Sequence, residues 1–255
     1  MTGSVLAPLA ARYPTWFTLA PGDTAASDED PTLVWVMPLV LRLERGGRSV
    51  RSEILAAAAT ASLLVCLDPR AERDGAWREP LHHWISGRIR KVARRARGSH
   101  WRAVQQLPGV TVTVGDAEVR ALVPTRVADT PREVSRLQIS GGVAAVDERP
   151  RVPPGVPSLL VNPALDMSLG KTAAQAGHAT MTLAAMLDDG ALRSWAAADY
   201  GCAVRDATED EWRQLVPGDD PAGAWRERGV VATRDAGLTE VDPGTITVLG
   251  VWGPN

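Results

Sequence analysis

Cysteine is scarce in this chain of 255 residues, and the sequence motifs of several large enzyme classes are missing. The two cysteines, Cys66 and Cys202, stand in apolar or strand-like surroundings without metal-site spacing, which predicts buried, reduced thiols. The sequence also lacks CxxC, HExxH, a Walker loop, GxGxxG and a serine nucleophile motif. These absences argue against chemistry that needs a metal ion, a cofactor or a covalent serine intermediate.

Long apolar runs are missing as well. No segment reaches the ~18 consecutive apolar residues that a membrane-spanning helix needs, and residues 1–30 lack the basic start and apolar stretch of a signal peptide. We therefore expect a cytoplasmic protein with no membrane partner. Apolar residues still make up 45% of the chain, which is enough for packed cores, and the length suits one large or two small domains.

Charge is balanced overall but unevenly distributed. The formal net charge is −2. Residues 31–150 carry 19 Lys and Arg against 12 Asp and Glu, whereas residues 151–255 carry 8 against 14. A basic half beside an acidic half predicts that only one face of the protein binds polyanions.

Composition divides the chain into four parts. Residues 1–30 have weak periodicity and end in three acids, which predicts a loosely ordered arm. Residues 31–140 form a basic N-terminal α/β domain and possible degenerate repeat. Residues 141–157 contain three Gly and four Pro and form a linker. The most distinctive sequence motifs lie in the last part, 158–255.

Hydrophobic periodicity predicts similar elements in both halves. In the first half we expect an apolar strand at 33–43, where Pro38 implies a bend or an edge position, then helices at 48–67 and 84–106 and a hairpin at 110–123.

The second half starts with a predicted strand at 158–162 and a helix at 169–187. Further strands are expected at 202–208, 230–235 and 245–251. The prediction is an α/β fold with a small mixed β-sheet and helices on both faces. We expect it twice, as a degenerate N-terminal copy and a motif-bearing C-terminal copy.

Three polar side chains share one face of the predicted helix at 169–187. Lys171, Gln175 and His178 are spaced i, i+4 and i+7 and project from the same side. The helix dipole disfavours a cation at Lys171, so a substrate phosphate is a natural partner, and the Gln175 amide can serve an ester or a ribose hydroxyl. His178 has apolar neighbours, so a packed histidine is an equal alternative to a supporting role in the site.

The segment DAGLTEVDPGTITVLG at 235–250 carries a second group of candidates. Asp235 ends a predicted strand at an Ala-Gly turn, a usual place for a site carboxylate in an open α/β sheet, although a turn-forming role is the alternative. Asp235 could accept a proton from water while Thr239 or Thr247 orients that water or a carbonyl group.

These two segments together resemble the archaeal and eukaryotic type of peptidyl-tRNA hydrolase, the second class of that enzyme. The first family motif is matched by Leu165, Met167, Gly170, Lys171, Ala173, Ala174, Gln175, His178 and Ala179. The second is matched by Asp235, Ala236, Gly237, Thr239, Glu240, Pro243, Gly244, Thr245, Thr247 and Leu249. The resemblance covers roughly residues 158–252.

The resemblance implies hydrolysis of the ester that joins a peptidyl group to the terminal ribose of tRNA, with tRNA as partner and no cofactor. It implies that Lys171 holds phosphate or the oxyanion and that Asp235 and Thr239 activate water. Gln175 and Thr247 would position the ester.

Three further residues are expected at the substrate-binding surface: His178, Gly170 and Thr245. The chain also departs from the family: among other changes, Asn162 and Ala164 replace an Arg and an Asp, and Leu238 replaces a residue that is often basic. Two alternatives therefore stay open, a non-catalytic RNA- or ribosome-binding module and a hydrolase redirected to another ester or amide.

The predicted helix at 84–106 is strongly basic. Its segment GRIRKVARRARGSHWR at 87–102 has six cationic side chains within ten residues and no acid to offset them. A solvated helix face is one interpretation. The other is a phosphate-binding clamp for tRNA, in which Arg90, Arg94 and Arg97 contact the backbone.

Overall fold

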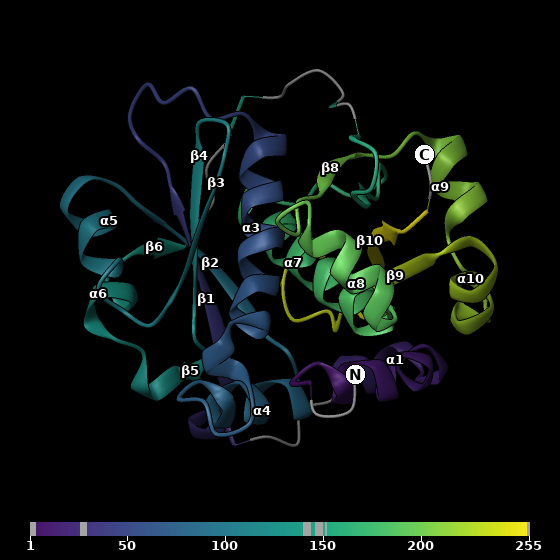
Figure 1. The fold of residues 1–255 in the computed structure, drawn as a ribbon, viewed down its shortest axis with the longest axis horizontal. Helices are drawn as coiled ribbons and strands as arrows, with labels where there is room; N and C mark the ends of the chain where they lie inside the picture. The colour runs from purple at the N-terminus through teal and green to yellow at the C-terminus, as the bar shows by residue number, and fades with distance from the viewer. Residues whose placement is uncertain (1–3, 26–29, 140–143, 146–149, 151, 254–255) are drawn as a thin grey trace.

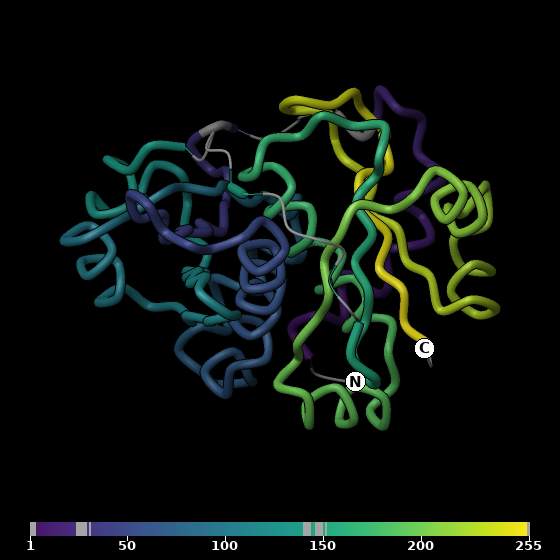
Figure 2. The backbone as a smooth tube through the Cα atoms, turned by 90° about the horizontal axis from the view of Figure 1, so that it is seen from above, coloured from purple at the N-terminus to yellow at the C-terminus, as the bar shows by residue number. Residues whose placement is uncertain are grey.

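The computed structural model describes residues 4–25, 30–139, 144–145, 150 and 152–253. Two α/β units lie side by side in Figure 1, and Figure 2 shows them from above. We call residues 31–139 the N-terminal unit and residues 158–253 the C-terminal unit.

The N-terminal unit is built on a six-stranded mixed sheet with the order β3-β4-β1-β2-β6, and the short β5 also pairs with β1. β1 and β2 are parallel, and the other pairs are antiparallel. The strands are β1 (Trp35–Arg42), β2 (Lys91–Ala96), β3 (Gly109–Val114), β4 (Ala117–Leu122), β5 (Thr125–Arg126) and β6 (Gln138–Ile139). The helices are α3 (Arg51–Leu67), α4 (Arg78–Ser86), α5 (Gly98–Val104) and α6 (Arg132–Ser135), with 3-10 turns at Pro31–Leu33, Pro69–Ala71 and Val127–Asp129.

The C-terminal unit contains a four-stranded sheet with the order β8-β7-β10-β9, in which only β7 and β8 are parallel. The strands are β7 (Ser158–Val161), β8 (Ala203–Asp206), β9 (Val230–Arg234) and β10 (Ile246–Val251). The helices are α7 (Leu169–Met186), α8 (Asp189–Ala196), α9 (Glu209–Leu215) and α10 (Pro221–Arg228).

The two sheets repeat one topology. The order β2-β1-β4-β3 in the first unit matches β8-β7-β10-β9 in the second, with the same parallel and antiparallel pairs. Register gives the residue equivalence: Leu39 pairs with Ala121, the fifth residue of β4, and Leu159 pairs with Gly250, the fifth residue of β10. The α/β prediction is thereby confirmed, and the two sheet units fit the expected presence of two copies.

Helices cover both faces of each sheet because successive side chains of a strand point to opposite faces. Leu39 packs into the main core with α3, whereas Val40 belongs to a separate cluster that includes Trp101 of α5. In the C-terminal unit, Leu159 joins the main core, while Leu160 packs into an outer cluster with residues of α9. The main core is therefore continuous between the two units.

Helices α3 and α7 pack against each other between the two sheets (Figure 1). Both are rich in alanine, which lets their backbones approach closely. A Cβ added at Gly177 of α7 would lie 2.4 Å from the Ser62 Oγ of α3, so this contact requires glycine. Each helix also contacts a strand of the other unit, α7 with β2 and α3 with β8.

Helix α1 (Ala7–Thr18) stands within the segment for which the sequence predicts a loosely ordered arm, and for these residues the prediction is wrong. The backbone N–H of Ala232 donates to the Tyr13 hydroxyl at 2.8 Å, and the Trp16 Nε1 donates to the carbonyl of Arg234 at 3.1 Å. These partners on β9 are more than 200 positions away, so local periodicity could not reveal them. A short helix, α2 (Pro21–Ala25), follows.

The basic segment at 84–106 does not form the single helix that the sequence predicts. Helix α4 ends at Ser86, residues Lys91–Ala96 form β2, and α5 begins at Gly98. Pairing of β2 with β1 overrides the good helix propensity of its Arg and Ala residues. The arginines therefore alternate between the two faces of a strand.

Of the two expectations for Pro38, a bend or an edge position, the edge position is wrong, because β1 is an inner strand. On one side of β1 the ladder is interrupted: Val36 pairs with Thr125 of β5 and Leu39 with Ala121 of β4. Pro38 lies at this gap, where its missing N–H breaks no ladder bond.

The remaining predictions concern boundaries and membranes. Strand β6 ends at Ile139 and β7 begins at Ser158, while part of the predicted linker 141–157 lies outside the described residues. Its boundaries stay a prediction. Among helices of the described residues, none is long and apolar enough to cross a bilayer.

Candidate active site

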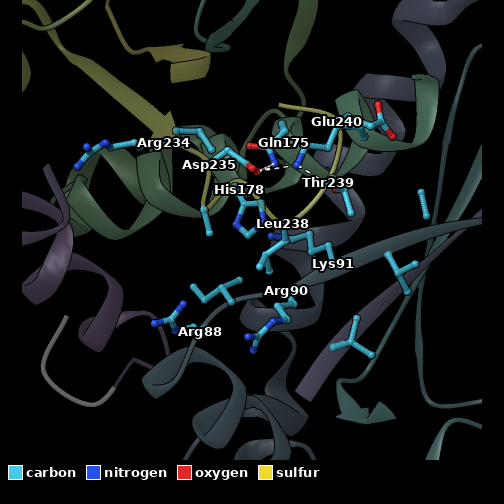
Figure 3. A pocket seen from close by; sticks show the side chains of 18 of the residues that line it. Arg88, Arg90, Lys91, Gln175, His178, Arg234, Asp235, Leu238, Thr239 and Glu240 are labelled. Atoms are coloured by element: carbon cyan, nitrogen blue, oxygen red, sulfur yellow. Dashed lines mark hydrogen bonds and ion pairs between the residues drawn. The ribbon is translucent and has the colours of Figure 1, made fainter. Parts of the chain in front are cut away.

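The first turn of α7 anchors the candidate site. The Ser168 side chain caps the helix by accepting from the backbone N–H of Lys171 at 3.2 Å. The helix then presents Lys171, Gln175 and His178 on one face, and all three line the same cavity. Figure 3 labels Gln175 and His178 of this face. The spacing in the sequence predicted this common face.

Asp235, the residue after β9, is held by three donors. Its Oδ2 accepts from the Lys171 Nζ at 2.7 Å and from the Gln175 Nε2 at 2.7 Å. Its Oδ1 accepts from the backbone N–H of Gly237 at 2.8 Å. The Lys171 and Asp235 side chains are only 9% and 10% exposed, so this ion pair is largely removed from water.

The two threonines have different places. The Lys171 Nζ also approaches the Thr239 Oγ1, at 3.4 Å, so Thr239 shares the cavity with the ion pair. Thr247 is fully buried behind Gln175, where its hydroxyl donates to the Gln175 Oε1 at 2.7 Å. This bond turns the Gln175 NH₂ group toward Asp235. Thr247 thus contacts the site through Gln175 rather than from the cavity wall.

The loop between β9 and β10 is held in place by hydrogen bonds to the start of α7 and by a tight turn. The Ser168 N–H and hydroxyl donate to the Glu240 carboxylate at 2.8 and 2.9 Å. Gly237 has a φ of +75° and a Cβ there would meet Pro243 at 2.4 Å, so this turn requires glycine. Thr245 lies outside the cavity lining; its carbonyl accepts from the Asp235 N–H at 2.8 Å.

The cavity has a volume of about 490 Å³ and is shared by three parts of the chain. The C-terminal unit supplies the ion pair and also Gly170. Helix α1 contributes Arg12 and Trp16. The N-terminal unit supplies apolar side chains and three cations: Val34, Val36, Ile89, Val127, Ile139, Arg88, Arg90 and Lys91.

Burial and neighbouring charge control the ionisable groups on this wall. Burial lowers the pKa of His178 well below its ordinary value, and the cations Lys91, Lys171 and Arg12 lower it further. His178 is therefore neutral near pH 7. Burial also lowers the pKa of Lys91, to about 7.

The structure separates the three arginines that the sequence groups together. Arg90 lines the cavity. Arg94 is on β2, which begins after Arg90, and it donates to the carbonyl of Leu137 at 2.6 Å. Arg97 is exposed at the start of α5. Only Arg90 of the three is in a position to contact a molecule in the cavity.

The departures from the family pattern have local explanations. The Asn162 side chain donates to the carbonyl of Ile246 at 2.9 Å and accepts from the N–H of Ala164 at 3.0 Å, so it fixes the turn after β7. Leu238 is 52% exposed and lines the cavity.

The sequence motifs did not reveal the contributions of α1 and of β2 to the cavity. Arg12 and Trp16 sit in a segment without a site-like pattern, whereas Arg88 and Lys91 stood within the segment interpreted as one basic helix. Within the described ranges, no group of three or more His, Cys, Asp or Glu side chains is arranged to hold a metal ion.

Comparison with known proteins agrees with the motif positions. Residues 157–255 match the model of the family peptidyl-tRNA hydrolase PTH2. A search of curated proteins found no match. The matched range contains the whole C-terminal unit, with Lys171, Gln175 and Asp235. The C-terminal part of this chain is thus similar to the PTH2 family of peptidyl-tRNA hydrolases over residues 157–255.

Proposed function

We propose that this protein hydrolyses the ester bond of peptidyl-tRNA in the cavity between its two units, and releases free tRNA and peptide. The family of the C-terminal unit implies a hydrolase that acts on peptidyl-tRNA. The observation that carries the proposal is the Asp235 carboxylate, held on the cavity wall by Lys171 and Gln175.

In the proposed step, Asp235 is the general base. Its Oδ1 accepts one backbone N–H and keeps a lone pair for a water molecule. The hydroxyl of Thr239 accepts from Lys171, so its own proton is left to orient that water or the ester carbonyl. The water attacks the carbonyl carbon as Asp235 takes its proton, and the Lys171 ammonium stabilises the oxyanion.

Gln175 and Thr247 act as positioning residues in this proposal. Thr247 holds the Gln175 oxygen, one Gln175 N–H binds Asp235, and the second N–H is directed to the ester. His178 and Gly170 form part of the binding surface. The step is assigned to side chains and water alone.

The N-terminal unit is proposed to bind the tRNA backbone. The C-terminal part is net acidic, whereas residues 31–150 have a surplus of seven positive charges. Arg88 and Arg90 bring part of this charge into the cavity beside the ion pair. Phosphate groups pair well with the planar guanidinium group.

The test is hydrolysis of N-acetylated aminoacyl-tRNA by the purified full chain, compared with simple esters and amides. Faster cleavage of the tRNA ester supports the proposal. Binding of tRNA without cleavage would favour a non-catalytic RNA-binding module instead. Faster cleavage of simple esters or amides would favour a redirected hydrolase, a reading compatible with the apolar part of the cavity.

A further inference from the structure

Lys91 lines the cavity, although it belongs to the N-terminal unit. It is the first residue of β2, and Figure 3 shows its side chain next to His178. Its Nζ is buried and has no hydrogen-bond partner among the described residues. The Trp84 ring centroid is 5.2 Å from this atom. A cation–π contact offsets only part of the free energy needed to bury an ammonium group.

The titratable groups around Lys91 do not neutralise it. Cys66 of α3 and His178 of α7 interact with it, and Lys171 of α7 and Arg12 of α1 line the same cavity. Asp235 is bound to Lys171 and Gln175, and burial raises the pKa of the Cys66 thiol to about 12. The buried charge of Lys91 therefore lowers the free energy of unfolding of the free protein. Buried ionisable groups with a shifted pKa are enriched at functional sites.

The C-terminal unit shows that the fold does not require an amine at this position. Register makes Cys202, the residue before β8, the equivalent of Lys91, because Leu39 pairs with Ala93 and Leu159 with Val204. Cys202 faces Thr60 of α3, with 3.8 Å between Sγ and Oγ1. Counted from the helix N-caps, Thr60 is the equivalent of His178. A neutral pair thus fills the place that Lys91 and His178 occupy at the cavity.

Lysine is also rare in this chain. Of its 28 Lys and Arg residues only Lys91 and Lys171 are lysines, and both line this one cavity. Arginine keeps its proton at every ordinary pH, whereas a buried lysine can lose one. The chain uses arginine at every other cationic position, and both of its lysines line this cavity.

We propose that Lys91 is a second catalytic amine, which gives its proton to the ribose oxygen as the ester bond breaks. The inference rests on the proposed function. Water adds to the carbonyl carbon and Asp235 takes one proton. The bond between the carbonyl carbon and the ribose oxygen then breaks, its electron pair stays on that oxygen, and the oxygen takes a proton from Lys91. Solvent returns the proton from Asp235 to the neutral amine.

A pKa of about 7 suits this transfer, because an acid is most effective when its pKa lies near the working pH. Arg88 and Arg90 cannot replace Lys91 in this step, because a guanidinium group does not release its proton. Their place in the proposal is the binding of phosphate.

The test compares Lys91→Met, Lys91→Arg and a control, Arg136→Met, which removes one exposed charge of the same unit outside the cavity. Loss of a general acid lowers kcat by about 10²–10⁴-fold, and we expect this for both Lys91 variants with little change in KM. The control should match wild type. In wild type, kcat should fall as the pH rises above about 7, where Lys91 loses its proton.

Stability gives an independent measure of the same group. The pKa of Lys91 falls from 10.5 to about 7 on folding, so the buried charge destabilises the protein fully below pH 7 and not at all above pH 10.5. Lys91→Met should therefore raise Tm below pH 7, and the gain should shrink as the pH approaches 10.5. A fall in both kcat and Tm at pH 6 would instead identify Lys91 as a structural residue and overturn the inference.

A binding experiment separates this inference from the proposed function. In protein labelled with ¹⁵N at the lysine side chains, only two side-chain resonances are expected. A tRNA that carries its acyl group through a non-hydrolysable 3′-amide should shift the Lys91 resonance. Cleavage of the tRNA ester with unchanged kcat in both Lys91 variants overturns the role of Lys91 alone. A Lys91 shift in a protein without hydrolase activity overturns the proposed function but keeps the contact. If the tRNA ester is not hydrolysed and the Lys91 resonance does not shift, both the proposed function and the role of Lys91 are overturned.

Discussion

The N-terminal and C-terminal units follow one strand order, but they differ in one connection between strands. This connection joins β3 to β4 near the start of α3, and β9 to β10 near the start of α7. Strands β3 and β4 are joined by two residues, Gly115 and Asp116, whereas eleven residues, 235–245, join β9 and β10. A two-residue hairpin leaves no room for side chains that reach toward a helix. The longer loop carries Asp235 and Thr239 to the start of α7.

The helices differ in the same comparison. Counted from the N-caps Val50 and Ser168, Glu53 is the equivalent of Lys171. Glu53 accepts from the backbone N–H of Asp116 at 3.2 Å, so it fastens the short hairpin. Lys171 instead binds the Asp235 carboxylate. In both units the start of a helix lies opposite the connection between two antiparallel strands. The length of that connection and a few side chains decide whether the residues there only stabilise the fold or form a candidate active site.

The largest effect should come from the residue that only the long loop provides. Asp235→Asn should lower kcat by about 10²–10⁴-fold if the carboxylate is the general base. Asp242→Asn, an exposed position in the same loop, is the matched control and should retain activity. Turnover and melting temperature of the two variants check the prediction. Normal turnover of Asp235→Asn would remove this residue from the mechanism.

Lys171 should rank second. Lys171→Ala removes the ammonium proposed for the oxyanion, and loss of one such donor usually costs about 10²–10³-fold in kcat. Lys171→Arg keeps the charge but not the compact shape, so recovery of turnover would show that charge alone suffices. Equal loss in both variants would show that geometry matters. If neither alters hydrolysis or tRNA binding, the site lies elsewhere.

Arg90 and Arg94 allow a comparison between an arginine that lines the cavity and one that does not. Arg90→Gln should raise KM for tRNA. It should also make the slope of log binding constant against log salt concentration less negative by about 0.7–0.9, the effect of one lost phosphate contact. Turnover at saturation should change little, because the contact exists in the ground state and in the transition state. KM measured across a salt series provides the check.

Arg94→Gln serves as the comparison within this strand. Its guanidinium bonds the Leu137 carbonyl, so the variant should lose about 1–2 kcal/mol of unfolding free energy and keep its KM. Equal effects of the two variants on KM would mean that the tRNA path runs over the outer face of β2 rather than through the cavity.

The smallest effect is expected in the N-terminal unit. Glu53→Ala removes the acceptor of the Asp116 N–H and should cost about 0.5–1.5 kcal/mol in unfolding free energy, the usual value of one hydrogen bond. Hydrolysis should stay at the wild-type rate. Denaturant unfolding and the tRNA assay together test this, and a loss of turnover similar to that of Lys171→Ala would show that the short hairpin also takes part in the reaction.

Much of the C-terminal unit could be predicted because its signals are local. The capping Ser168 and the spacing of Lys171, Gln175 and His178 fix a helix face, and this face appears in the structure. The basic segment was misassigned because local propensity favoured a helix, and only its pairing with β1 made Lys91–Ala96 a strand. Thr247 was predicted at the ester, but its bond to Gln175 depends on how β10 packs against α7.

The sequence by itself determined the carriers of the proposed chemistry: the polar face of α7 and the Asp-Ala-Gly turn after β9. Only the tertiary structure decided which other groups meet them. Helix α1 reaches β9 through Trp16, and Lys91 reaches His178 because α7 packs across β2. Such contacts join residues far apart in the chain, so no local pattern reveals them. They depend on the small residues of α3 and α7, which let the two helices pack closely and bring the N-terminal unit to the wall of the cavity.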